Sequence, residues 1–72
     1  MTKLNIWEKI AINENKEATH IKRNVFGNIV FIKMYQNVLV DEVETLRYND
    51  LFQSIKIGET VSIKKLKGDQ KW

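Results

Sequence analysis

The chain has 72 residues, enough for one small domain near the lower limit at which a core holds without disulfides or metals. Its formal net charge is +3, and with no cysteine and one histidine it excludes disulfides and thiolate zinc sites. The longest apolar run, 29–32, is far shorter than the roughly 20 residues that a membrane-spanning helix needs. We therefore expect a soluble, cytoplasmic protein with no cofactor and no membrane partner.

The first segments read as two short strands. Residues 4–12 fit either a strand or a short helix, and their β-branched residues and the following turn residues 13–16 favour the strand. No convincing N-cap precedes them in this interpretation. Residues 18–25 alternate apolar and polar side chains, which predicts a second strand paired with the first in a hairpin.

The middle of the chain predicts two further strands. Residues 29–35 are apolar on both faces, as expected of a central strand, and the pair 36–37 makes a turn. Residues 38–43 are expected to form the next strand, with residues 45–48 continuing it past a bulge. Residues 49–53 are long enough for one helical turn.

A closing hairpin is predicted over residues 54–66. Ile55 and Ile57 share one face of its first strand, and Val61 and Ile63 share one face of its second. Gly58 supplies the positive φ of the turn between them. Lys65 breaks the alternation and indicates a bulge. Together these segments predict a single all-β domain over 1–72. Its architecture would be a small five- to six-stranded antiparallel barrel, OB-like, with an SH3-like barrel as the alternative.

Charge is distributed unevenly along the chain. Residues 1–33 carry six cationic side chains against three anionic ones, 34–53 one against four, and 54–72 five against two. In a small barrel the first and last strands are often neighbours, so the basic ends are expected to merge into one patch. Asp41, Glu42 and Glu44 would form an acidic belt elsewhere. A mixed, solvated surface is the simpler alternative.

Two stretches resemble a known family. Residues 27–32 read Gly-Asn-Ile-Val-Phe-Ile, similar to a Gly-x-Val-x-x-Ile opening strand. Residues 55–66 are similar to a closing Leu-Lys-Val-Gly-Asp-x-Val-x-Val-Lys-Val-Leu, with Asp69 in the place of the acidic residue that often follows. Over 27–69 the chain thus resembles the S1-type OB-fold RNA-binding domains. The resemblance implies that Tyr35 keeps the first aromatic of the family's platform, Val38 replaces the second, and Tyr48 stands in for a histidine.

The leading functional prediction is a non-enzymatic module that binds single-stranded RNA or DNA with weak sequence specificity. Such binding needs aromatic side chains for base stacking and cations for phosphates. The candidate contacts are Lys22, Arg23, Lys33, Tyr35, Tyr48, Lys56, Lys64, Lys65 and Lys67. The C-terminal lysines are the strongest of these, although lysines also protect edge strands from aggregation.

The alternative prediction is a small protein-interaction or inhibitor module of phage or plasmid type. A bias toward Lys, Ile and Asn is typical of AT-rich coding, as in low-GC bacteria and their phages. Such a module would act through the acidic belt or an exposed edge strand. An edge strand would also allow a homodimer. Neighbouring residues of the belt point to opposite faces of a strand, so neither an enzyme nor a metal site is expected.

Overall fold

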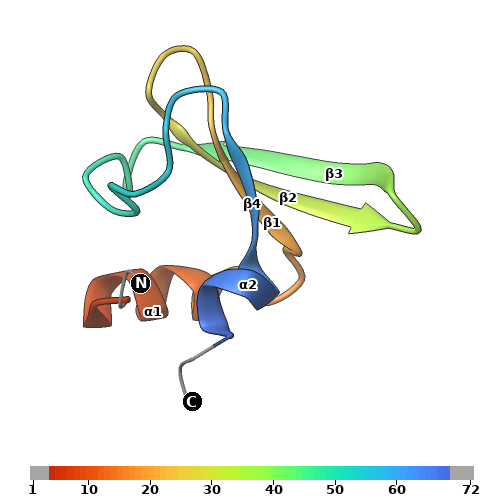
Figure 1. The fold of residues 1–72 in the computed structure, drawn as a ribbon, viewed down its shortest axis with the longest axis horizontal. Helices are drawn as coiled ribbons and strands as arrows, with labels where there is room; N and C mark the ends of the chain where they lie inside the picture. The colour runs from red at the N-terminus through yellow and green to blue at the C-terminus, as the bar shows by residue number, and fades with distance from the viewer. Residues whose placement is uncertain (1–3, 69–72) are drawn as a thin grey trace.

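The computed structural model describes residues 4–68. The elements are helix α1 (Ile6–Glu14), strands β1 (His20–Arg23), β2 (Ile29–Tyr35), β3 (Val38–Thr45) and β4 (Thr60–Ser62), and helix α2 (Ile63–Lys67) (Figure 1). The strands form one antiparallel sheet in the order β3-β2-β1-β4. The structure fits the all-β prediction in the coarser sense that the described residues are mostly β, built on one antiparallel sheet. The five- to six-stranded barrel is wrong, because within residues 4–68 the sheet has four strands and stays open between β3 and β4.

The strand predicted over residues 4–12 is wrong, because this segment forms α1. Asn5 is the N-cap: its side chain accepts a hydrogen bond from the backbone N–H of Glu8 at 2.8 Å. The Glu8 carboxylate accepts one from the backbone N–H of Asn5 at 2.9 Å, which completes a capping box. The capping box stabilises a helix here more than the β-branched residues of the segment favour a strand. The predicted first hairpin is wrong too, since β1 pairs with β2 and β4.

The β2–β3 hairpin follows the sequence prediction closely. β2 covers the expected residues and lies inside the sheet, with β1 and β3 on either side. Gln36 and Asn37 have φ of +50° and +65°, the left-handed pair that matches strand twist in a two-residue hairpin turn. Lys33 lies opposite Asp41 and Met34 opposite Leu39, so Val40 is an extra, bulged residue of β3.

The closing hairpin predicted over 54–66 is wrong. Only Thr60–Ser62 is a strand, and it pairs with β1, while Ile57 makes a single bridge to Arg23. Ser62 then caps α2, so Lys65 is helical and does not lie in a bulge. Gly58 has the expected positive φ, +84°. The helical turn expected at 49–53 is a series of irregular turns.

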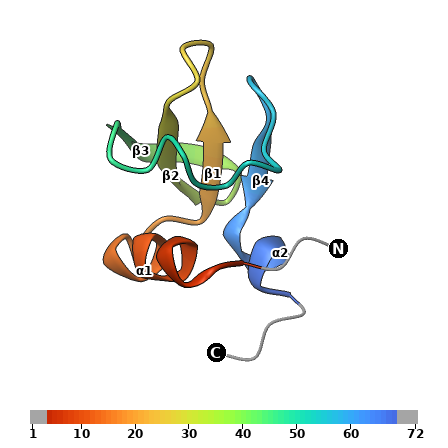
Figure 2. The same cartoon turned by 90° about the vertical axis from the view of Figure 1, so that its left-hand side faces the viewer.

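One face of the sheet carries the core. Ile21, Ile29 and Phe31 pack there against α1 and against Phe52 and Ile55 of the irregular segment 46–59. Figure 2 shows this segment crossing β2 and β1, with α1 below the strands. We call this the core face and the opposite one, which carries Val30 and Ile32, the outer face. Neither helix in the described part of the chain is long and apolar enough to span a membrane.

Candidate functional site

Arg23, a predicted phosphate contact, is buried and structural. Only 8% of its surface is exposed, and all five of its side-chain N–H donors bond to backbone carbonyls. Nε donates to Ile55 at 2.9 Å, and the two Nη atoms donate to Gly27, Asn49, Leu51 and Phe52 at 2.6 to 3.1 Å. A planar guanidinium reaches several carbonyls at once, as a lysine cannot. Arg23 therefore braces segment 46–59 and is unavailable to a ligand.

Glu8 holds the same segment from the other side. Its second carboxylate oxygen accepts the backbone N–H of Phe52 at 2.6 Å, and its side chain is buried. Phe52 has φ of +56°, a conformation that bulky residues rarely adopt. The segment is thus held between the Arg23 guanidinium, which binds its carbonyls, and the Glu8 carboxylate, which binds an N–H. We call these two residues the clamp.

The predicted lysines do not gather in one patch. Lys64 and Lys67 of α2 line an open depression of about 600 Å³ with His20 of β1. Lys22 lies two residues beyond His20 and therefore on the same, outer face, where it forms no ion pair with another described residue. The remaining predicted lysines are elsewhere: Lys33 pairs with Glu17 at 3.8 Å on the core face, Lys56 lies exposed in segment 46–59, and Lys65 is exposed on α2.

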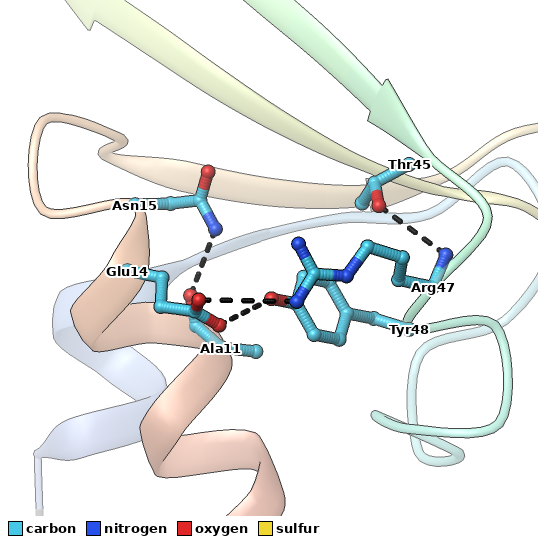
Figure 3. Close-up of polar contacts among 6 residues, drawn as sticks. All are labelled: Ala11, Glu14, Asn15, Thr45, Arg47 and Tyr48. Atoms are coloured by element: carbon cyan, nitrogen blue, oxygen red, sulfur yellow. Dashed lines mark hydrogen bonds and ion pairs between the residues drawn. The ribbon is translucent and has the colours of Figure 1, made fainter.

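The two predicted stacking tyrosines do not form a platform. Tyr35 is 67% exposed at the end of β2, next to the hairpin turn. Tyr48 is half-buried, packs edge-on against Phe31 and donates its hydroxyl to Glu14 of α1 at 2.5 Å. This hydrogen bond raises the pKa of Tyr48. Figure 3 shows Arg47 beside the Tyr48 ring, its guanidinium carbon 5.3 Å from the ring centroid, so one ring face is already occupied.

The most exposed regular element is β3. Its residues are exposed along the whole strand except the last, Thr45, which is half-buried. Four large apolar side chains, Val38, Leu39, Val40 and Val43, each expose 51 to 63% of their surface. Within residues 4–68, β3 has a neighbouring strand on one side only. Its other edge therefore presents backbone N–H and C=O groups without a strand partner beside apolar side chains, and one of them, the N–H of Glu42, donates to the side-chain carboxylate of Asp41 at 2.9 Å.

Three acidic residues and no basic one lie in β3. Pairing places Glu42 and Glu44 on the outer face, opposite Ile32 and Val30, and Asp41 on the core face, opposite Lys33. Neither Asp41 nor Glu42 makes an ion pair within the described residues. The β3 edge is therefore apolar at its start and negatively charged beyond the bulge.

Glu44 is held in place by neutral groups. The side-chain amides of Asn28 and Asn24 donate to the same carboxylate oxygen at 2.7 and 2.6 Å. These hydrogen bonds lower the pKa of Glu44 below its ordinary value of 4.5. The amides fix the carboxylate without neutralising it, so it remains ionised at neutral pH and contributes a fixed negative charge to the edge.

Sequence reasoning missed the clamp. It also set aside the helical alternative for residues 4–12, on which Ile6, Trp7 and Ile10 form an exposed apolar face. The Asn-x-x-Glu capping signature at residues 5–8 was the available signal. No comparable signal marks the role of Arg23, because its partners are main-chain carbonyls 4 to 32 residues away.

No protein-family model, curated protein or solved structure matches the chain. The S1-type resemblance therefore stays a prediction. One of its residues, Asp69, lies outside the described part of the chain.

Proposed function

We propose that this chain is a non-enzymatic, cytoplasmic protein-interaction module that takes up an extended segment of a partner alongside β3. The supporting observation is the exposure of β3: seven of its eight residues are exposed, its outer edge has no strand partner within residues 4–68, and four of its apolar side chains are half-exposed. In strand addition the main-chain hydrogen bonds give affinity and the alternating side chains give specificity. β3 offers both over eight residues.

The other edge of the sheet is much less suited to this role. β4 has three residues and leads directly into α2. β3 is longer, and the hairpin that contains it extends away from both helices, as Figure 1 shows. Its bulge at Val40 and its acidic residues are features that natural edges use to limit indiscriminate pairing. An edge protected in this way favours a chosen partner over aggregation.

The test is to select binding peptides from a random display library and map them by amide NMR on the labelled full chain. We expect selected peptides to shift and protect the β3 amides. Val40→Lys should weaken their binding, and the control Ile57→Lys, at a somewhat more exposed apolar position outside the four strands, should not. Peptides that map only to other surfaces would contradict the proposal.

A second candidate is single-stranded nucleic acid binding, which an S1-type relationship would favour. The supporting observation is that Lys64, Lys67 and His20 surround one depression, with Lys22 on the same face. Binding of labelled single-stranded RNA and DNA should then weaken steeply with salt. It should be lost on reversing Lys22 and Lys64 to glutamate and kept in Val40→Lys. The opposite pattern would reject this candidate.

A further inference from the structure

The β3 edge has a direction. Its first three residues, Val38–Val40, are apolar, and its acidic residues all follow the bulge, at Asp41, Glu42 and Glu44. A strand that pairs with β3 therefore meets an apolar half and an anionic half in a fixed order. The order of basic and apolar residues in the partner would determine which way it can lie.

Negative charge borders β3 on both faces of the sheet. On the outer face a hollow of about 260 Å³ holds two carboxylates of β3, Glu42 and Glu44, against one cation, Lys22. On the core face a smaller hollow of about 180 Å³ lies beside Asp41. Its lining carries three carboxylates, from Glu14, Glu17 and Asp41, against two cations, Lys16 and Lys33. Successive side chains of an added strand point to alternate faces, so cations on either face would lie near a carboxylate.

A second copy of the chain is a poor occupant. Antiparallel pairing of β3 with its own copy in full overlap places Asp41 opposite Glu42 twice. Shifting the register by one residue places Asp41 opposite Asp41, or Glu42 opposite Glu42. Like charges directly opposite one another destabilise a strand pair. The self-pairing registers with the longest overlap therefore bring like charges together, and a cationic segment complements β3 better than a second copy does.

We infer that the partner of β3 is a protein carrying an extended segment in which basic residues precede apolar ones, bound antiparallel to β3. This rests on the proposed function. Every strand pair of the sheet is antiparallel, and such pairs are slightly more stable than parallel ones. In that orientation the first half of the partner segment lies opposite residues 41–45 and its second half opposite Val38–Val40.

The probe is the labelled heptapeptide Thr-Lys-Val-Lys-Lys-Val-Val, whose lysines would face Glu44, Glu42 and Asp41. Three matched peptides accompany it: the reversed order, a version with glutamate for each lysine, and a version with alternate backbone N-methylation. We expect the first peptide to bind about tenfold or more tightly than the others and to shift the β3 amides, since each opposed charge pair and each main-chain bond contributes. The N-methylated peptide keeps its charge but loses backbone N–H donors. If it binds as tightly as the first peptide, binding depends on charge attraction and not on strand pairing, and the inference is overturned.

A compensating change in the protein sharpens the test. The double variant Asp41→Lys, Glu42→Lys should prefer the glutamate peptide by about tenfold, and Asp50→Lys, a matched reversal outside β3, should leave the original preference intact. Glu44 is left unchanged because its carboxylate holds the side chains of Asn24 and Asn28.

The possible failures can be told apart. If the lysine and glutamate peptides shift the β3 amides equally, the partner is not basic, but the proposed strand addition still stands. Equal affinity for the reversed peptide would overturn the antiparallel assignment. Failure of every peptide to shift β3 amides at millimolar concentration, or a β3-paired dimer of the chain, would count against the proposed function itself.

Discussion

Segment 46–59 and strand β3 reverse the usual relation between regular structure and burial. The segment forms no helix or strand, yet Phe52 and Ile55 are almost fully buried and its main chain is held by Arg23 and Glu8. β3 is a strand of eight residues interrupted only by its bulge at Val40, yet all but the last of its residues are exposed to solvent. The irregular segment completes the core, whereas β3 leaves its side chains and outer edge exposed, as the proposed strand addition requires.

Removing Arg23 should break the clamped segment and have the largest effect. Arg23→Ala leaves five carbonyls without their donor, so we expect the free energy of unfolding to fall by about 3 kcal/mol or more, a large share for a domain of this size. Arg23→Lys should recover only part of this, because one ammonium cannot reproduce the fork. Urea unfolding followed by circular dichroism measures both.

The matched control for Arg23 is its neighbour on β1. Lys22→Ala changes a side chain on the outer face and should alter stability by less than about 0.5 kcal/mol. If Arg23→Ala were as mild as Lys22→Ala, the clamp would not be what holds the segment.

Glu8 tests the other side of the clamp with a smaller effect. Glu8→Ala removes both the reciprocal bond of the capping box and the acceptor for Phe52, which should cost about 2 kcal/mol. Glu8→Gln keeps an acceptor oxygen and should cost less. The exposed Glu17→Gln serves as the control, since the ion pair of Glu17 with Lys33 is at the surface. Equal stability of the Ala and Gln variants would argue against the bond to Phe52.

Acid should loosen the anchored end of β3. The lowered pKa of Glu44 means that its contribution to stability is present above pH 4.5 and is lost as the pH falls through the folded-state value. A carboxyl NMR titration should place this pKa below 4.5, and Asn28→Ala should raise it by removing the larger hydrogen-bond contribution. Glu44→Gln should abolish this part of the acid dependence. A pKa of 4.5 or higher in the unmodified chain would show that the amides do not hold the carboxylate.

Substitutions on the exposed side of β3 should also have a small effect on stability. Replacing Val38, Leu39 and Val40 together by threonine keeps β propensity and removes exposed apolar surface, so stability should change by less than about 1 kcal/mol. The same variant should lose most of its affinity for the peptide probe. A large loss of stability would show that these side chains support the fold and would remove the contrast with segment 46–59.

The predictable parts of this fold are those coded locally. The β2–β3 hairpin could be predicted from two apolar segments separated by two turn residues. The positive φ of Gly58 could be predicted because glycine has no side chain to hinder it. The strand predicted at residues 4–12 failed because a capping box, also local, was overlooked. The closing hairpin failed for a different reason: the alternation of Val61 and Ile63 continues across the boundary of β4 and α2, so pattern alone cannot locate the change.

The candidate site was predictable in part. The acidic belt and an exposed edge strand were among the predictions, but the sequence could not tell which strand would be an edge, because that depends on the order of strands in space. Arg23 was grouped with the surface cations because charge is normally solvated. Its burial depends on carbonyls brought together only when segment 46–59 has folded back.

The clamp also bears on the order of events in folding. The hairpin joins residues that are close in the chain, whereas Arg23 meets its partners in segment 46–59 across 26 to 32 residues, and Glu8 meets Phe52 across 44. Contacts between such distant residues carry a larger loop-closure cost and tend to form after local ones. The β2–β3 hairpin is then expected to exist before the clamp closes, and closure of the clamp would set the lifetime of the native state rather than the speed of reaching it.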